Sequence, residues 1–177
     1  QRRKTMFISE GKDNKTVANF SEDLNEHNAK ATQIKEVSCD MSPAFIKGVT
    51  EQLPNAKITF DKFHILKIIN SGVDKVRRAE SIDNPLLKNS RYVFLKNDIN
   101  LTSKQRAKKE ELLMPKLNLK SVRAMHIREN FQQIYSANNS DEFEYLLKKW
   151  HSWATRSKLK PMVKVAKTIK SHWEGIL

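Results

Sequence analysis

Apolar residues in the first part of the chain follow two different spacings. Short apolar runs predict strands over residues 4–11, 34–40 and 57–60. Apolar residues at helical spacing predict helices over residues 16–30 and 43–53 and another helix from Asp61 onward. This alternation of strands and helices is typical of an α/β fold, in which the strands lie buried between helices.

The starts of these helices carry the residues that such starts favour. Ser42 is the predicted N-cap of the second helix, and Pro43 follows at the first helical position, where its missing N–H costs nothing. The helix that begins near Asp61 has a single apolar stripe, which is made of Ile65, Ile68, Ile69, Val73 and Val76. We therefore expect that stripe to face a core.

After residue 80 the strand patterns fade and helical spacing dominates. It predicts helices over residues 103–114, 121–136, 141–157 and 162–177, while residues 91–95 suit a strand or a helix equally. Thr102 and Ser140 are predicted N-caps, and Pro161 is a predicted first helical residue. We therefore expect an α/β region over residues 1–80 and an all-helical region over residues 81–177.

Two tryptophans fall on or near one stripe of the third of these helices. Trp150 and Trp153 lie close, at helical spacing, to Phe143, Leu146 and Leu147. Core packing and base stacking are both possible roles for such aromatic residues, and the apolar neighbours favour the core.

Composition indicates a globular domain with a polyanionic partner. The chain has 177 residues, 38% of them hydrophobic, and no apolar run approaches the ~20 residues that a membrane span needs. The single cysteine, Cys39, suits a reducing cytoplasm. The net charge is +13, and it is uneven: residues 1–80 carry 14 Lys and Arg against 11 Asp and Glu, whereas residues 81–177 carry 19 against 9. Nucleic acid is the commonest partner of so basic a surface.

Several pairs and rows of cations are candidate phosphate contacts. They are Arg77, Arg78, Lys108, Lys109, Lys148, Lys149, Lys164, Lys167 and Lys170. Each of them could also be ordinary solvated surface. Glycine-rich phosphate loops are not expected, because the sequence has only 4 glycines.

Two aspartates follow predicted strands directly. Asp40 and Asp61 each stand between a strand and the helix after it. In α/β sheets, ligands bind at the carboxyl ends of strands, and a carboxylate there offers the hard oxygen ligands that Mg²⁺ or Mn²⁺ prefers. Paired metal ions can support phosphodiester attack. The alternative is that each aspartate only caps the helix that follows it.

The sequence around these aspartates resembles that of one known family. The stretch "VSCDMSPAFIKGVTEQLPNAKITFDKFHILKIIN" is similar to the second-aspartate region of the insertion-sequence transposases of the ISL3 family. The segments "RYVFLKN", "NLTSKQR", "KKWHSWATRSKLKPM" and "SHWEGIL" are similar to the helical region of the same family. The resemblance covers nearly the whole chain.

This resemblance implies a fold and a chemistry. The family has a ribonuclease-H-like catalytic domain with an Asp-Asp-Glu metal triad, a helical insertion before the glutamate, and divalent-metal-dependent cutting and joining of transposon-end DNA. Asp40 matches the second metal-binding aspartate. Asp61 and His64 match a D-x-x-H element, for which we expect roles in supporting the site or positioning DNA. For His64, an ordinary helix histidine is the alternative.

The resemblance also implies that the chain is a fragment. The strand with the first aspartate is expected before Gln1 and the glutamate after Leu177, because Glu174 in "HWEGIL" comes earlier than the family's glutamate. We therefore expect an incomplete ribonuclease-H-like sheet with flanking helices, and no activity or bound metal in the fragment alone. In the full-length protein we expect Mg²⁺ or Mn²⁺, transposon-end and target duplex DNA, a homo-oligomer, and the nucleoid of a bacterial cytoplasm. The alternative function is a non-catalytic DNA-binding or scaffolding module.

Overall fold

Two units of structure make up the chain in the computed structural model, which describes residues 5–11 and 13–177. The sheet unit comprises residues 1–65 and 174–176, and the helical unit comprises residues 66–173 and residue 177. The boundary between them falls inside a helix. The division that the charge pattern suggested, at residue 80, stays a prediction, because compactness and charge are different properties.

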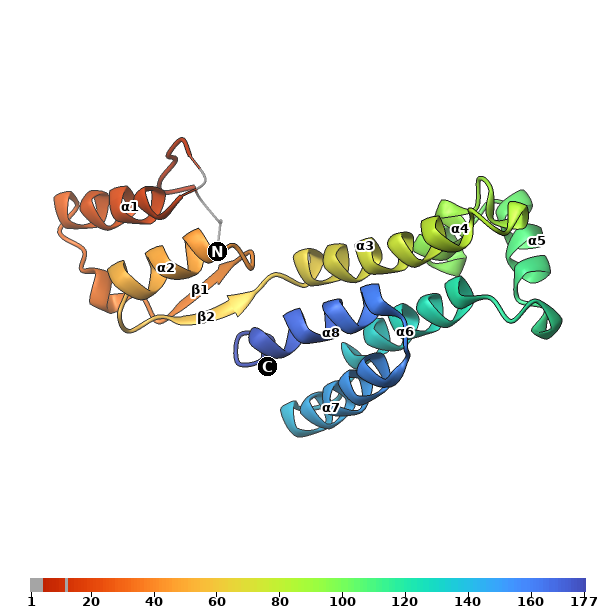
Figure 1. Ribbon diagram of the computed structural model, residues 1–177. Helices are drawn as coiled ribbons and strands as arrows, with labels where there is room; N and C mark the ends of the chain where they lie inside the picture. The colour runs from red at the N-terminus through yellow and green to blue at the C-terminus, as the bar shows by residue number, and fades with distance from the viewer. Residues whose placement is uncertain (1–4, 12) are drawn as a thin grey trace. The chain divides into compact units, whose positions relative to one another are not determined.

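The sheet unit contains two strands, three helical segments and the start of a third long helix. In chain order these are α1 (Asn14–Glu26), the 3₁₀ turn η1 (Ala31–Gln33), β1 (Glu36–Cys39), α2 (Pro43–Gln52), β2 (Lys57–Phe60) and the first turn of α3 (Lys62–Glu80). Figure 1 shows α1 and α2 side by side, next to the two strands. The order strand, helix, strand from residue 36 to residue 60 agrees with the prediction.

The strands are parallel and in register, with Val37 opposite Ile58 and Cys39 opposite Phe60. One face of this two-stranded sheet is apolar and packs with Val17 of α1 and Val49 of α2 in a small core. The other face is exposed and polar. It carries Glu36 and Ser38 of β1 and Lys57 and Thr59 of β2. The expectation of strands buried between helices is therefore wrong for these described residues.

A third predicted strand, over residues 4–11, is also wrong as far as the structure describes it. Residues 5–11 form no strand, and Lys4 lies outside the described residues. Phe7 instead packs against Phe20 of α1, with the ring centroids 5.6 Å apart. Of the three apolar residues in this segment, Phe7 therefore packs on a helix, whereas Met6 and Ile8 are 77% and 86% exposed.

The helical unit continues along α3 and adds five more helices and three 3₁₀ turns in the described chain. They are η2 (Pro85–Leu87), α4 (Arg91–Leu95), η3 (Asp98–Asn100), α5 (Ser103–Leu112), η4 (Pro115–Leu117), α6 (Lys120–Ile134), α7 (Ser140–Arg156) and α8 (Lys160–Ser171). Residues 91–95, which suited a strand or a helix, are helical. None of the helices among the described residues is long and apolar enough to cross a membrane.

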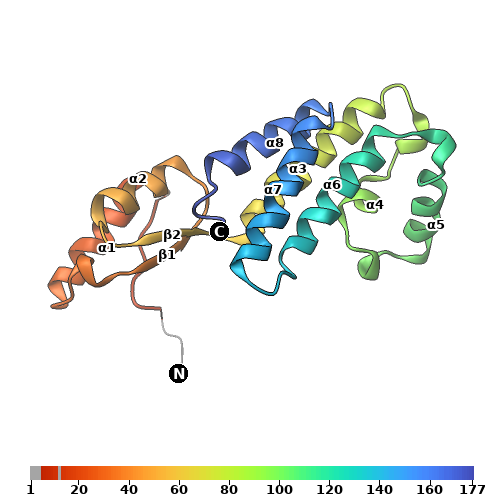
Figure 2. The ribbon, with the colours of Figure 1, turned by 90° about the horizontal axis from the view of Figure 1, so that it is seen from below.

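The core of the helical unit lies where α6, α7 and α8 pack beside one another (Figure 2). The fully buried ring of Trp150 meets Phe131 edge-on, with centroids 4.8 Å apart, and its Nε1 donates to the carbonyl of Ile127 at 2.8 Å. Gly72 of α3 lets α8 approach closely, since a Cβ there would lie 2.7 Å from Val165 Cγ2. The helices are therefore held by close side-chain packing.

Helix starts agree with the prediction at Thr102 and differ at Ser140. Thr102 accepts the Gln105 N–H, and Gln105 in return accepts the Thr102 N–H, which is a complete capping box. The N-cap of α7 is Asn139 rather than Ser140, and its side chain accepts the Glu142 N–H. Pro161 stands one residue later in α8 than predicted.

Candidate functional site

Asp40 and Asp61 lie next to each other at the carboxyl end of the sheet. Each follows directly after one member of the register pair Cys39 and Phe60. The Asp61 N–H donates to the Cys39 carbonyl at 3.1 Å, which extends the ladder past the last paired residues. The parallel pairing therefore brings together the two carboxylates that the sequence singled out, at the edge where α/β sheets bind ligands.

The half-buried carboxylate of Asp40 holds the turn that leads into α2. Its Oδ1 accepts the Ser42 N–H at 2.8 Å, whereas the Ser42 side chain makes no capping bond. The Cys39 thiol is also affected, because burial and the negative charge of Asp40 raise its pKa. Among the described residues no hydrogen bond engages Oδ2 of Asp40. One oxygen of this carboxylate therefore has a structural role, and the other is open to a ligand.

Asp61 is more fully engaged than Asp40. Its Oδ1 accepts the Phe63 N–H at 2.7 Å, and its Oδ2 lies 3.5 Å from Nδ1 of His64. The structure therefore brings Asp61 and His64 together on the first turn of α3, as the D-x-x-H spacing requires. Asp61 is therefore placed to hold the helix start through Oδ1, while its Oδ2 faces His64 without a hydrogen bond.

The residues present fit a hard divalent cation only in part. Carboxylate oxygens are the ligands that Mg²⁺ and Mn²⁺ prefer, and Asp40 has one to offer. In the part of the chain that the structure describes, no three His, Cys, Asp or Glu side chains come together as a metal site. Asp40 can therefore supply one ligand, and the described chain places no complete set around it.

Glu174 belongs to a segment at the opposite edge of β2. The Phe60 N–H donates to the Gly175 carbonyl at 2.7 Å, and a Cβ on Gly175 would lie only 2.4 Å from the Phe60 ring. Since the Asp61 N–H points to β1 and the N–H of the preceding residue points the other way, residues 174–176 follow the side of β2 away from β1. Glu174 itself is exposed.

The lysine row of α8 is on the surface. Lys164, Lys167 and Lys170 are all exposed, as the spacing predicted, and the Lys170 ammonium lies 4.4 Å from the centre of the Trp173 ring. None of the three makes an ion pair with a carboxylate among the described residues. Their charges therefore remain available to an outside anion.

The arginine pair of α3 shares one carboxylate, that of Asp74. Arg77 donates from Nε and Nη2 to Asp74 Oδ1, at 2.9 and 2.7 Å. Arg78 lies 3.2 Å from the other oxygen of the same carboxylate, and Arg91 lies 3.8 Å from it. Arg77 is mostly buried against this carboxylate and is a weaker candidate for phosphate contact than the row on α8, whereas the side chain of Arg78 is 62% exposed and stays a candidate.

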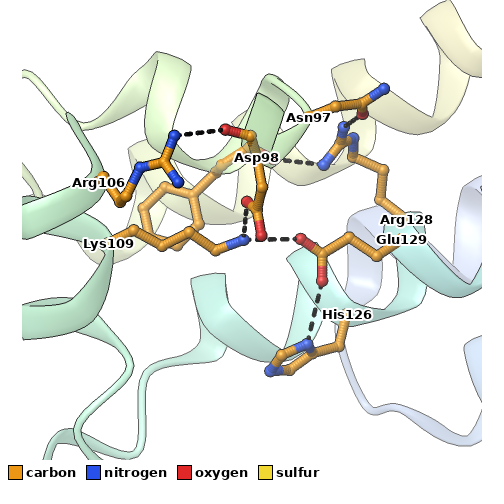
Figure 3. A network of polar contacts seen from close by, with 8 residues as sticks. Asn97, Asp98, Arg106, Lys109, His126, Arg128 and Glu129 are labelled. Atoms are coloured by element: carbon orange, nitrogen blue, oxygen red, sulfur yellow. Dashed lines mark hydrogen bonds and ion pairs between the residues drawn. The ribbon is translucent and has the colours of Figure 1, made fainter. Parts of the chain in front are cut away.

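Lys109 is part of a buried network and not of the surface (Figure 3). Its ammonium donates to Asp98 at 2.5 Å and to Glu129 at 3.0 Å, and Glu129 also lies 3.3 Å from His126. Burial alone would lower the pKa of Lys109, but the bonds to the two carboxylates outweigh it and raise the pKa. The prediction that Lys109 contacts phosphate is therefore corrected, because its charge holds α5 and α6 together.

The remaining lysines divide in a similar way. Lys108 donates to Glu111 at 2.8 Å, and Lys148 pairs with Glu144 at 2.6 Å. Lys149 is exposed and pairs with no carboxylate in the described chain, and its ammonium lies 4.5 Å from the centre of the Tyr145 ring. Lys149 therefore joins the α8 lysines as an available cation.

Trp153 was expected in the core, and the structure corrects this. Trp150 is fully buried, whereas 44% of Trp153 is exposed, on a helix whose other face holds the core. Three residues of helix turn the side chain by about 60° away from its neighbour's direction. The charged neighbours of Trp153 in the sequence indicate that it is exposed. Lys149 stands four residues before Trp153 and Arg156 three residues after it, on one helix face.

Comparison with known proteins agrees with the resemblance. The chain is 27% identical to the transposase for insertion sequence element IS1001 of Bordetella parapertussis, over 99% of this chain and 44% of that protein. It is 26% identical to the transposase for insertion sequence element IS1557 of Mycobacterium tuberculosis, over 94% of this chain and 43% of that protein. The chain thus spans less than half the length of these curated relatives. No solved structure matches it significantly.

A family model described as transposase, that of the ISL3 group, matches residues 1–177, which is the whole chain. The match includes the strand ends with Asp40 and Asp61 and all the helices of the helical unit. The chain belongs to the ISL3 family of transposases.

Proposed function

We propose that this chain is part of a DNA transposase that cuts and joins transposon-end DNA, and that Asp40 is one of its metal-binding carboxylates. The observation that carries the proposal is the half-buried Asp40 at the carboxyl end of β1, with one oxygen uncommitted. The family match over the whole chain and the names of the curated relatives support the activity. In this proposal β1 and β2 are two strands of a larger ribonuclease-H-like sheet.

A divalent ion such as Mg²⁺ or Mn²⁺ would supply charge stabilisation at the phosphate during attack by water and then by a freed 3′-hydroxyl. Asp40 would hold such an ion through Oδ2 while Oδ1 keeps the start of α2 in place. Asp61 and His64 would position DNA or the neighbouring backbone. The remaining ligands of a triad would come from residues that are not clustered with Asp40 in the described chain.

Duplex DNA is the proposed partner of the exposed cations. Lys164, Lys167 and Lys170 form the available row on α8, in a half of the sequence with a net charge of +10. In this proposal a homo-oligomer holds two transposon ends. The cutting and joining takes place at the nucleoid, in the cytoplasm of a bacterium.

One observation favours a second candidate, a non-catalytic DNA-binding or scaffolding module. Asp40 lacks two further metal-binding side chains close by among the described residues. A module of this kind would use the helical unit and keep Asp40 only to hold the turn before α2.

Substitution of Asp40 in the complete transposase separates the two candidates. Asp40→Asn keeps an oxygen for the Ser42 N–H, so we expect the protein to fold, but it removes the charge that binds the cation. Cleavage of transposon-end DNA should fall by roughly 10³-fold, because a bound metal ion contributes several kcal/mol to the transition state. Gel-shift affinity for the same DNA should change little. Cleavage and binding assays on one preparation check both outcomes.

The matched control is Asp61→Asn, at the equivalent position of the neighbouring strand. It keeps the cap on Phe63 and loses part of the hold on His64, so cleavage should fall by about tenfold. Unchanged cleavage by Asp40→Asn would favour the non-catalytic module. Equal losses in both variants would show that the two carboxylates do not differ in the way proposed.

A further inference from the structure

One face of α7 combines exposed aromatic rings with cations. Tyr145, Lys149, Trp153 and Arg156 follow one another at intervals of four, four and three residues, so they lie along a single helix face, here called the α7 face. Tyr145 is 55% exposed and Trp153 is 44% exposed, although both are large aromatic residues. Trp150 lies about 60° around the helix from Trp153 and is buried in the core, whereas the α7 face lies on the surface.

The ring of Trp153 is unoccupied. In the described chain, Trp153 has no hydrogen bond, ring contact or cation against it. The other two tryptophans differ: Trp150 donates to the Ile127 carbonyl, and Trp173 is 8% exposed and lies under the Lys170 ammonium. An exposed, unoccupied tryptophan is a common anchor for a binding partner.

The charges beside Trp153 indicate which kind of partner fits. Lys149 and Arg156 make no ion pair with a carboxylate among the described residues, whereas the neighbouring Lys148 pairs with Glu144. Arg156 is held along the helix by its Nε, which donates to the Ser152 carbonyl at 3.1 Å. Two uncompensated cations therefore flank the ring, and they complement a polyanion.

The acidic residues of α7 limit the site to the later part of the helix. Asp141 and Glu142 lie in its first turn, and Asn138 donates to the Glu142 carboxylate from both its backbone N–H and its side chain. These charges would repel phosphates near the start of the face. The basic part therefore begins at Lys149.

We infer that the α7 face binds unpaired DNA, with a base stacked on Trp153 and phosphates beside Lys149 and Arg156. Stacking needs the flat face of a base, which a duplex hides between neighbouring pairs and a single strand offers. Tyr145 contributes less, because the Lys149 ammonium already covers one side of its ring. This inference rests on the proposed function, since the cutting of transposon ends is a process that can expose unpaired bases.

Tryptophan fluorescence of the full chain tests the inference, because Trp153 alone among the three tryptophans is exposed. A 15-nucleotide oligothymidylate should quench part of the emission, and Trp153→Phe should abolish that quenching. By anisotropy of the labelled oligonucleotide, Trp153→Ala should bind roughly tenfold more weakly. Trp153→Phe, which keeps a ring, should recover part of the affinity. A 15-base-pair duplex should bind all three proteins within about twofold.

The matched control is Tyr92→Ala. Tyr92 is 54% exposed and stands beside two cations, but Arg91 and Lys96 both lie over its ring and Arg91 also pairs with Asp74. Its removal should leave single-strand affinity unchanged. Thermal melts of each variant check that the fold is intact.

Three results would overturn the inference: no quenching by the oligonucleotide, an equal loss of duplex and single-strand affinity in Trp153→Ala, or a loss of self-association in Trp153→Ala with DNA affinity unchanged. The last would identify a second copy of the chain as the occupant of the α7 face. The Asp40→Asn cleavage assay does not depend on Trp153, so failure of this inference can be told apart from failure of the proposed function.

Discussion

At the scale of single residues, Asp40 shows that one carboxylate can both hold a turn and be a candidate metal ligand. Its Oδ1 accepts the Ser42 N–H and its Oδ2 has no hydrogen-bond partner among the described residues. The sequence could place an aspartate after a strand, because the end of an apolar run is visible in it. The division of the two oxygens depends on the backbone path between β1 and α2, which no residue pattern states.

Lys109 shows a limit of the same kind. The pair Lys108 and Lys109 offers two equivalent cations in the sequence, yet the structure buries Lys109 and leaves Lys108 half-buried beside Glu111. The partners of Lys109 are Asp98 and Glu129, which stand 11 and 20 residues away. Contacts at that separation follow from helix packing, so charge counting alone could not identify Lys109 as structural.

At the scale of elements, strong local patterns were sufficient for a correct prediction and weak ones were not. The two strands around Val37 and Ile58 and the seven longer helices of the described chain were all expected, since apolar spacing and Pro43 or Thr102 mark them. The segment at residues 5–11 has a short apolar run like that of a strand but no neighbouring strand to pair with among the described residues. Strand formation requires such a partner, which the run itself does not reveal.

The start of α6 is another feature that the local sequence does not contain. Its N-cap is Leu119, which has no polar side chain. Glu80, at the end of α3, takes over the role: its carboxylate accepts the N–H groups of Lys120 and Ser121, both at 2.7 Å, and the Ser121 hydroxyl at 2.6 Å. A negative charge at a helix N-terminus also interacts favourably with the helix dipole.

Glu80→Ala should therefore destabilise the helical unit. It leaves two N–H groups and a hydroxyl without their acceptor, so the free energy of unfolding should fall by roughly 1–3 kcal/mol. Circular dichroism melts provide the measurement, and Glu80→Gln should fall between the two proteins because it keeps one acceptor. Asp83→Ala, at an exposed carboxylate nearby, is the control. A melting temperature for Glu80→Ala equal to that of the control would show that the cap is unimportant.

At the scale of the whole molecule, positive charge is spread unevenly between the two halves of the sequence. Residues 81–177 carry most of the net charge, and the available row of candidate phosphate contacts lies on α8, with Lys149 on α7. Ion pairs in the described chain neutralise many of the other cations, among them Arg77, Lys108 and Lys109. The total charge of this half can be counted from the sequence, but only the structure separates its available charges from its structural ones.

The salt dependence of DNA affinity tests which lysines are available to phosphates. If Lys164, Lys167 and Lys170 contact phosphates, the affinity for duplex DNA should fall steeply with salt, and replacing all three by Glu should reduce the slope of log K against log[salt] by up to about 3. Replacing Lys30, Lys35 and Lys57, which are exposed in the sheet unit, changes the net charge equally and should leave the slope nearly unchanged. Equal slopes in the two triple variants would place the DNA contacts elsewhere.

The central claim, that Asp40 binds the divalent ion, is tested most directly by changing the metal preference of that position in the complete transposase. Asp40→Cys replaces a hard oxygen ligand by a soft sulfur, which Mg²⁺ binds poorly and Mn²⁺ tolerates better. Cleavage of transposon-end DNA is measured with each ion. We predict that Asp40→Cys loses cleavage with Mg²⁺ and regains a measurable part of it with Mn²⁺. Cleavage with Mg²⁺ at the rate of the unchanged protein, or the same loss with both ions, would contradict the account.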